Sequence, residues 1–200
     1  MRGSQGAIDR GIEKRAEMEE YMNIIRRLRK GTELLRKNWL VLKTNFSLKT
    51  GRRVTIGKRT DILIEGNGLI ELGNYSSVAQ DSHIAAIGGH LTVGDHSYFN
   101  RRANVVCRGK ITIGDNCAIG PNVTIYDHDH KFGTNGQESG FNTGEIHIGN
   151  NCWIGANVTI LRGTYIGDNC VIGAGCIVKG EIPCNNLITQ DRKLIITELR

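Results

Sequence analysis

Aliphatic residues recur at a strict interval of six over most of the chain. The longest run is Ile148, Ile154, Ile160, Ile166, Ile172 and Val178, and shorter runs are Ile113, Ile119 and Ile125; Leu72, Val78 and Ile84; and Val93, Phe99 and Val105. A six-residue period fits no α-helix, but it fits a short strand and a corner with the aliphatic side chain pointing inward. Three hexads predict one triangular coil, with coils stacked about 4.8 Å apart. The chain is therefore predicted to be all-β, a parallel β-helix of about six coils.

The residues between the aliphatic positions suit tight corners. Six units open with an aliphatic residue and Gly, in most cases followed by Asp or Asn, at Ile56, Leu72, Val93, Ile113, Ile148 and Ile166. Gly, Asn and Asp tolerate the left-handed backbone conformation that a corner requires. The 200 residues include 26 Gly without a period of three and only 2 Pro, which excludes collagen. Aromatic residues are only 6% of the chain, and we expect the interior to be too narrow for rings.

Four cysteines occupy one repeating position, four residues after an isoleucine: Cys117, Cys152, Cys170 and Cys176. A small apolar side chain would serve there, so we expect reduced thiols buried in the core. The absence of a Cys-x-x-Cys pair and of a secretory leader favours the cytoplasm. No apolar run reaches 18 residues, so no transmembrane helix is expected.

Charge and pattern divide the chain into three segments. Residues 1–53 are predicted to be a helical, basic N-terminal segment, residues 54–183 the β-helix domain, and residues 184–200 a short tail. Residues 1–6, MRGSQG, resemble the remnant of an expression vector, with a native start as the alternative.

The N-terminal segment combines a helical pattern with positive charge. Apolar residues at three- and four-residue spacing predict an amphipathic helix from Ile8 to about Leu35, interrupted at Gly31, that packs on the main domain or on a neighbouring subunit. Residues 26–59 hold twelve basic side chains against one acid, Glu33. Such a segment can contact an anionic membrane, an acidic glycan or a phosphorylated ligand, or it can be a solvated face. No nucleic-acid-binding motif accompanies it, so nucleic acid is not expected as a partner.

One interval between coils is too long for a single coil. Ile113 and Ile148 lie 35 residues apart, against 16 to 21 for the other coil starts. The excess, residues 127–145, is polar and Gly-rich and cannot fit inside the prism. We expect it to project as a loop, and loops on a rigid scaffold are where binding and catalysis concentrate.

The repeats resemble the hexapeptide-repeat acyltransferases. The resemblance rests on IGPNVTIY leading into DHDH and on NCWIGANVTILRGTYIGDNCVIGAGCIV, and it covers about residues 54–183. Within that superfamily the sequence is most similar to the maltose and galactoside O-acetyltransferases and the surface-polysaccharide O-acetyltransferases. The resemblance implies a left-handed parallel β-helix and direct transfer of acetyl from acetyl-CoA to a hydroxyl of a sugar or polysaccharide. It also implies a homotrimer with active sites between subunits.

The resemblance places His130 at the catalytic position. A histidine suits the task because its pKa lies near neutrality, so it can accept the hydroxyl proton and later return it to the CoA thiolate. His128 is the competing candidate, because residues 128 and 130 of one strand point the same way. Asp127 and Asp129 are candidates to orient an imidazole.

The resemblance also assigns binding residues. Asn100 aligns with an asparagine that contacts the acceptor, and Trp153 aligns with a tryptophan beside the active-site channel, where it would contact acceptor and acetyl-CoA. The backbone expected to hold the pantetheine arm comprises Gly155, Ala156, Ala174 and Gly175. The backbone N–H of Ala156 would stabilise an oxyanion.

Two lysines are candidate ligands of the CoA phosphates, and both lie in altered motifs. The family's Thr-Lys-Asp-Ile-Pro is Lys-Gly-Glu-Ile-Pro here, beginning at Lys179. Its Gly-x-Pro-Ala-Lys is Thr-Gln-Asp-Arg-Lys, ending at Lys193. Either lysine is instead a solvated basic residue if CoA binds elsewhere.

Three other functions are compatible with the repeats. The acceptor can be another small molecule, such as an amine or a hydroxyl on a sugar or an antibiotic. The chain can also be a catalytically silent β-helix scaffold. A zinc enzyme of the γ-carbonic-anhydrase type needs three histidines, two of them five apart on one coil. No two of the six histidines have that spacing, so no metal is expected.

Overall fold

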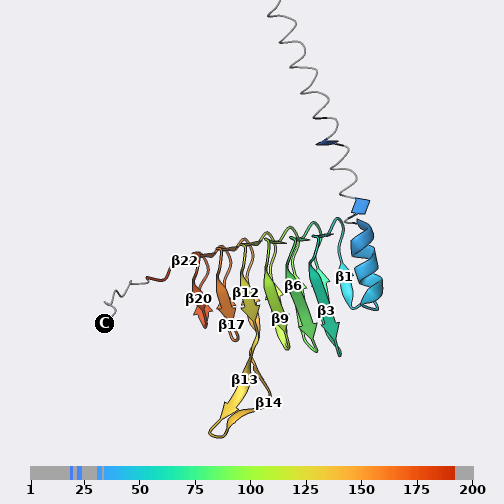
Figure 1. The fold of residues 1–200 in the computed structure, drawn as a ribbon. Coiled ribbons are helices and arrows are strands. Elements are labelled where there is room, and N and C mark those ends of the chain that lie inside the picture. Colours follow the sequence, from blue (N-terminus) through green and yellow to red (C-terminus); the bar gives the residue numbers. More distant parts are fainter. Residues whose placement is uncertain (1–18, 20–21, 24–30, 33, 192–200) are drawn as a thin grey trace, which may run out of the picture.

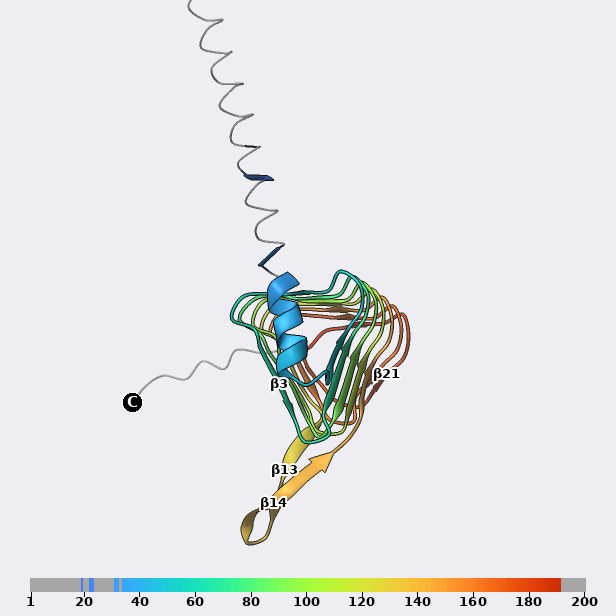
Figure 2. The same cartoon turned by 90° about the vertical axis from the view of Figure 1, so that its right-hand side faces the viewer.

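The protein was analysed as a computed structural model that describes residues 19, 22–23, 31–32 and 34–191 (Figure 1). Three parallel sheets form the sides of a prism that is triangular when viewed along its axis (Figure 2). Sheet A contains β1 (Leu48–Thr50), β4 (Leu69–Leu72), β7 (His90–Val93), β10 (Lys110–Ile113), β15 (Ile146–Ile148), β18 (Tyr165–Ile166) and β21 (Glu181–Ile182). Sheet B contains β2 (Thr55–Ile56), β5 (Ser77–Val78), β8 (Tyr98–Phe99), β11 (Ala118–Ile119), β16 (Trp153–Ile154), β19 (Val171–Ile172) and β22 (Leu187–Ile188). Sheet C contains β3 (Asp61–Glu65), β6 (His83–Ile87), β9 (Asn104–Cys107), β12 (Thr124–Tyr126), β17 (Thr159–Leu161) and β20 (Ile177–Val178).

The chain visits sheets A, B and C in turn. Within the described residues this produces six complete coils, and β21 and β22 begin a seventh. The predicted left-handed parallel β-helix of about six coils is confirmed. Strand pairing starts at Leu48 and continues to Ile188, so the coils extend beyond both ends of the segment 54–183 that the repeats delimit.

The N-terminal helix caps the first coil. Residues 34–43 are helical and lie beside β1 (Figure 1), where Leu40 is buried and Val41 packs against the core. The predicted interruption at Gly31 is wrong, because this glycine is helical, and the helix continues past Leu35. A single glycine costs a helix only about 1 kcal/mol, which packing of the last turns offsets. Most of the predicted span from Ile8, and all of residues 1–6, lie outside the described residues.

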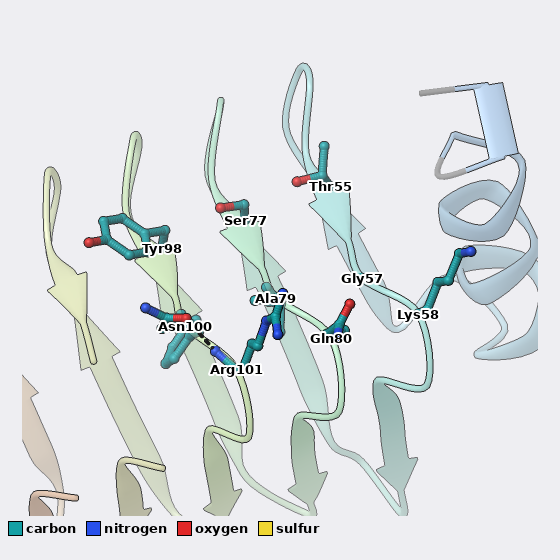
Figure 3. A pocket seen from close by; sticks show the side chains of 11 residues that line it. Thr55, Gly57, Lys58, Ser77, Ala79, Gln80, Tyr98, Asn100 and Arg101 are labelled. Carbon is teal, nitrogen blue, oxygen red and sulfur yellow. Dashed lines mark hydrogen bonds between the residues drawn. The ribbon is translucent and has the colours of Figure 1, made fainter. Parts of the chain in front are cut away.

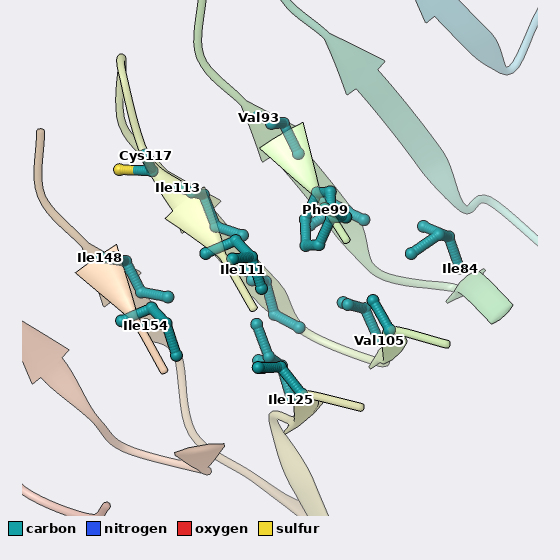
Figure 4. Close-up of a cluster of buried hydrophobic side chains, with 14 of the residues drawn as sticks. Ile84, Val93, Phe99, Val105, Ile111, Ile113, Cys117, Ile125, Ile148 and Ile154 are labelled. Carbon is teal, nitrogen blue, oxygen red and sulfur yellow. The ribbon is translucent and has the colours of Figure 1, made fainter. Parts of the chain in front are cut away.

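The hexad aliphatics form one continuous core along the prism axis. Ile125 pairs in register with Ile160 on the next coil, and both are fully buried. Figure 4 shows Ile113, Ile148 and their neighbours pointing inward. The expectation that the interior excludes rings is wrong at Phe99, which is 1% exposed on β8. Its partners in register on the adjacent coils are a valine and an isoleucine, which leave room for one ring.

The corners explain why Gly and then Asp or Asn follow the first aliphatic residue of most coils. The Asp115 backbone N–H donates to Oδ1 of Asn150 one coil away (2.8 Å), and the Asn150 N–H donates to Asp168 on the next coil (2.6 Å). A Cβ on Gly114 would lie 2.5 Å from that Asn150 oxygen, so the position before each link must be glycine. Asn116 and Asn151 then turn the chain at φ of 56°. The corner motif is therefore a ladder of side-chain acceptors that runs from coil to coil along the prism axis.

The cysteine positions follow the predicted pattern. Cys117, Cys152, Cys170 and Cys176 are buried, as is Cys107, whereas Cys184 is exposed and lies near the end of the described chain. Burial, with the nearby Asp127 carboxylate, raises the pKa of the Cys107 thiol to about 12. All six are unpaired thiols in the structure.

Native protein treated briefly with N-ethylmaleimide at neutral pH should gain one adduct, at Cys184, because the other thiols are shielded by the coils. Intact-mass spectrometry should show that single adduct, none in Cys184→Ser, and six after denaturation in urea. Rapid labelling of several sites in the native protein would contradict the buried ladder.

Candidate active site

The long insertion is a β-hairpin rather than an irregular loop. β13 (His128–Gly133) pairs antiparallel with β14 (Gly136–Thr143), and the hairpin projects from the prism where sheet C meets sheet A (Figures 1 and 2). Its base is Asp127, which directly follows β12. The hairpin presents both candidate histidines on one strand.

Asp127 fastens the hairpin to the prism. Its carboxylate is fully buried and accepts hydrogen bonds from the backbone N–H groups of Arg108 (2.8 Å) and Gly109 (2.7 Å) on the preceding coil. A buried carboxylate is tolerated only when such donors replace water. The buried acid therefore sets where the hairpin leaves the prism.

Asp127 also orients His128. Oδ1 of the carboxylate lies 3.1 Å from Nδ1 of His128. A carboxylate can only accept, so Nδ1 carries the hydrogen, and Nε2 of the neutral ring keeps its lone pair. The His128 side chain is largely buried and meets the Phe141 ring edge-on at 5.2 Å between centroids.

His130 is exposed, and it shares the neighbour Phe141 with His128. Its Nδ1 lies 3.0 Å from the side-chain nitrogen of Gln137, and its ring packs on Phe141 at 4.7 Å between centroids. Asp129 does not contact it, because that carboxylate accepts a hydrogen bond from Nε of Arg162. Of the two predicted aspartates, Asp127 contacts His128 and neither contacts His130.

Three residues of this site were missed by the sequence analysis. Phe141 packs on both histidines, Gln137 bonds one of them, and Arg108 lies over the Phe141 ring with its Cζ 3.8 Å from the ring centroid. The antiparallel pairing of the hairpin is what brings Phe141 and Gln137 next to the histidines. Residues 127–145 have no periodic pattern from which this pairing could be predicted.

Trp153 lies on the outer surface of sheet B. Its side chain is 58% exposed, and in the strand register it stands in one row with Tyr98, Ala118 and Val171. Its side chain therefore faces outward from the prism. The row is a flat, partly aromatic surface on which a ligand can lie.

The residues expected to hold the pantetheine arm stack at the corner between sheets B and C. The Gly155 N–H donates to the Ile172 carbonyl (2.7 Å), and the Gly175 N–H donates to the Ala156 carbonyl (2.8 Å), so both amides belong to the coil-to-coil ladder. Ala174 lies beside them, on the coil that follows Ala156. The Ala156 N–H has no acceptor within residues 34–191, which leaves it available to a bound carbonyl or oxyanion.

The two groups of candidate residues lie at different corners of the prism. Asn100 and Gly155 lie where sheet B turns into sheet C, whereas His130 lies beyond the far end of sheet C. The connection from Pro121 to Asp127 runs along one side of the triangle and can span about 20 Å. One protomer therefore does not bring His130 to Trp153. Lys179 is exposed at the hairpin's corner, two coils further on, and Lys193 lies outside the described residues.

A groove of about 530 Å³ crosses the outer face of sheet B at the first three coils (Figure 3). It contains Asn100, the predicted acceptor-binding residue. Its other lining residues are Thr55, Gly57, Lys58, Ser77, Val78, Ala79, Gln80, Tyr98, Phe99 and Arg101. The groove has the size of a small-molecule site.

The described part of the chain contains neither a metal-binding cluster nor a membrane-spanning helix. No group of three or more His, Cys, Asp or Glu residues is arranged there to hold a metal ion. No helix there is long and apolar enough to cross a membrane.

The coils match two models of repeat families. Residues 145–180 match "Bacterial transferase hexapeptide (six repeats)", and residues 103–127 match "Hexapeptide repeat of succinyl-transferase". These two segments of the chain are thus similar to the repeats of hexapeptide transferases. Nodulation protein L of Rhizobium meliloti (strain 1021) is 37% identical over 77 residues, which are 38% of this hexapeptide-repeat chain and 42% of that protein.

Solved structures of AntD, an N-acyltransferase from Bacillus cereus, share the fold of this hexapeptide-repeat chain. A point mutant of AntD in complex with dTDP and coenzyme A has a TM-score of 0.59 at 19% identity, covering 75% of this chain and 84% of AntD. AntD in complex with dTDP and 3-hydroxybutyryl-CoA has a TM-score of 0.60 at 18% identity, covering 72% and 79%. At this identity the comparison shows the architecture.

Asp127→Ala should lower the free energy of unfolding by about 2–4 kcal/mol, because it removes a fully buried carboxylate that accepts hydrogen bonds from the backbone N–H groups of Arg108 and Gly109. Hydrogen exchange should show the largest loss of protection in residues 128–143. Asp129→Ala is the matched control, since its carboxylate is exposed, and its stability should change by less than about 1 kcal/mol. Equal effects of the two substitutions would contradict the anchoring role of Asp127.

Proposed function

We propose that the protein is an acetyl-CoA-dependent O-acetyltransferase that acetylates a hydroxyl group of a sugar or polysaccharide precursor. The observation that carries the proposal is the hairpin, which projects from a prism of transferase-type repeats and presents an exposed histidine. The match to transferase-type repeats and the CoA-bound structures of the N-acyltransferase AntD support a CoA-dependent acyl transfer. Acetyl-CoA enters as the acyl donor, and no step requires a metal.

In the proposed mechanism His130 is the general base. Nε2 of the imidazole takes the hydroxyl proton as the acceptor oxygen attacks the thioester carbonyl carbon. This step requires the Gln137 amide to turn its oxygen toward Nδ1, because the amide nitrogen that lies there in the structure can only donate and would leave the hydrogen of the neutral ring on Nε2. The resulting oxyanion is stabilised by the backbone N–H of Ala156, which has no acceptor in the described chain. The tetrahedral intermediate then expels the CoA thiolate, which receives the proton from the imidazolium. The ester product and free CoA leave.

Exposure favours His130 over His128 as the base. A base must reach the acceptor hydroxyl, and the His130 side chain is exposed on the hairpin, whereas His128 is enclosed beside Asp127 and Phe141. We assign His128 and Asp127 to positioning the strand that carries His130. The Asp127–His128 pair has the geometry of an oriented base, so His128 is the second candidate.

We further propose that three copies associate and complete the sites between them. An isolated two-stranded hairpin is marginally stable in water, and here Phe132 near its tip is 78% exposed, so the hairpin needs a surface to cover it. The outer face of sheet B on a neighbouring copy offers Trp153 and the Asn100 groove. His130 of one copy then meets acetyl-CoA held along Trp153, Gly155 and Ala156 of the next.

We also propose a ligand for the CoA phosphates, a compartment, a surface contact and an alternative acceptor. Lys179, at an exposed corner, is a candidate ligand for the CoA phosphates. Reduced cysteines favour the cytoplasm. The basic residues 26–59 support contact with an anionic membrane or glycan. Because AntD is named an N-acyltransferase, a sugar amine is the alternative acceptor.

His130→Ala should lower kcat/KM for acetyl transfer by about 10²- to 10⁴-fold, because the acceptor hydroxyl loses its base. The measurement is CoA release with a panel of sugars, followed by chromatography of the acetylated product. His147→Ala is the control, since that ring stacks on Tyr165 away from the site, and it should keep its activity. An active His130→Ala with an inactive His128→Ala would move the base to His128, and activity in both would remove the histidine mechanism.

Mixed oligomers test whether the site is shared. Co-expression of His130→Ala chains with Asn100→Ala chains should restore about a quarter of wild-type activity, because that fraction of interfaces joins two intact halves in random mixing. Each variant alone should be inactive while keeping the size of the wild-type oligomer. If the mixed oligomers have no more activity than either variant alone, both residues act in the site of one protomer, and the shared site is contradicted.

A further inference from the structure

The groove on sheet B is lined by groups that suit a sugar. Thr55 and Ser77 offer hydroxyls, Gln80 and Asn100 offer amides, and Tyr98 contributes a ring that is 45% exposed. Hydroxyls and amides hydrogen-bond sugar hydroxyls in both directions, and an aromatic face packs on the C–H face of a pyranose. The groove contains no carboxylate.

Two cations also line the groove, and neither has an ion-pair partner among residues 34–191. Lys58 and Arg101 are both exposed. The neighbouring Asp81 is already engaged by Arg59, whose Nε and Nη2 lie 2.5 and 2.8 Å from its two carboxylate oxygens. That pairing lowers the pKa of Asp81, to which Arg101 makes only a lesser contribution. The groove therefore keeps two positive charges uncompensated by the protein.

The strand register sets the spacing of these cations. Arg101 follows β8, Gln80 follows β5 and Lys58 follows β2, so Lys58 and Arg101 lie two coils apart at one corner, as Figure 3 shows. Two coil spacings are about 10 Å. That distance accommodates a hexose between the cations, with a charged substituent directed at either of them. Asn100 and Tyr98 lie on the coil of Arg101.

We propose that the groove selects an anionic acceptor, a sugar that carries a carboxylate or a phosphate group. Arg101 binds the charged group, Tyr98 and Asn100 on the same coil contact the sugar ring, and Lys58 adds positive charge at the other end of the groove. The proposal rests on the transferase function proposed above and specifies its substrate class. It also gives a role to Lys58, which is one of the twelve basic residues of the segment 26–59.

Steady-state kinetics at saturating acetyl-CoA test this selectivity with three acceptors: methyl β-glucuronide, glucose 1-phosphate and methyl β-glucoside. At least one anionic sugar should have a KM about tenfold or more below that of the neutral glucoside, and the two anionic arms distinguish carboxylate from phosphate. Arg101→Gln should raise that KM about tenfold, with kcat changed by less than about twofold, because a charge-assisted hydrogen bond is lost. The KM for the glucoside should stay within about twofold, since its binding uses no charge.

Arg102→Gln is the matched control, because the adjacent arginine bonds Asn122 instead of lining the groove, and it should leave all three KM values unchanged. Equal KM values for charged and neutral sugars, or an Arg101→Gln enzyme with unchanged preference, would overturn the anionic acceptor while the transferase function stands. If no sugar is acetylated, the transferase proposal fails. Ligand-observed NMR with the glucuronide and with glucose 1-phosphate then tests whether the groove binds an anionic sugar, independently of catalysis. Binding of either sugar that weakens about tenfold in Arg101→Gln supports the anion site, and absence of binding or an unchanged affinity overturns it.

Discussion

The hydrogen bonding of each coil to the next is the interaction on which the whole molecule depends. Every strand of the three parallel sheets is short, and its backbone groups find strand partners only one coil above and below it. Equivalent residues must therefore repeat at nearly constant spacing, which produces the row of isoleucines inside and the Gly–Asp/Asn ladder at the corners. An insertion cannot enter such a stack and must leave at a corner, as the hairpin does after Asp127.

Much of the fold follows from the repeat, because one constraint acts on every coil. The number of coils, the buried cysteines and the outward orientation of Trp153 are all predictable from position within the hexad. The hairpin obeys no such period, so its strand pairing, and with it the contacts of Phe141 and Gln137, depends on tertiary packing. The buried ring of Phe99 was also not predictable from the repeat. The repeat predicts which positions face inward, whereas the volume available at one of them depends on the side chains of its neighbours.

The candidate site is divided by the same architecture. Residues on one strand and one corner stay together, so Asn100, Tyr98 and Arg101 share a groove that the register defines. His130 belongs to the opposite end of sheet C and is carried outward by the hairpin. Through resemblance, the sequence assigns both sets of residues to one reaction, and our proposal then requires a second copy to join them.

That requirement is tested most directly by a crystal structure of the protein with CoA bound. The account predicts three copies, with the CoA thiol next to His130 of one copy and the pantetheine arm along Trp153 and Ala156 of its neighbour. The Phe132 side chain should be covered by that neighbour. A CoA molecule held entirely by one copy, with the hairpin still free in solvent, would contradict the shared site.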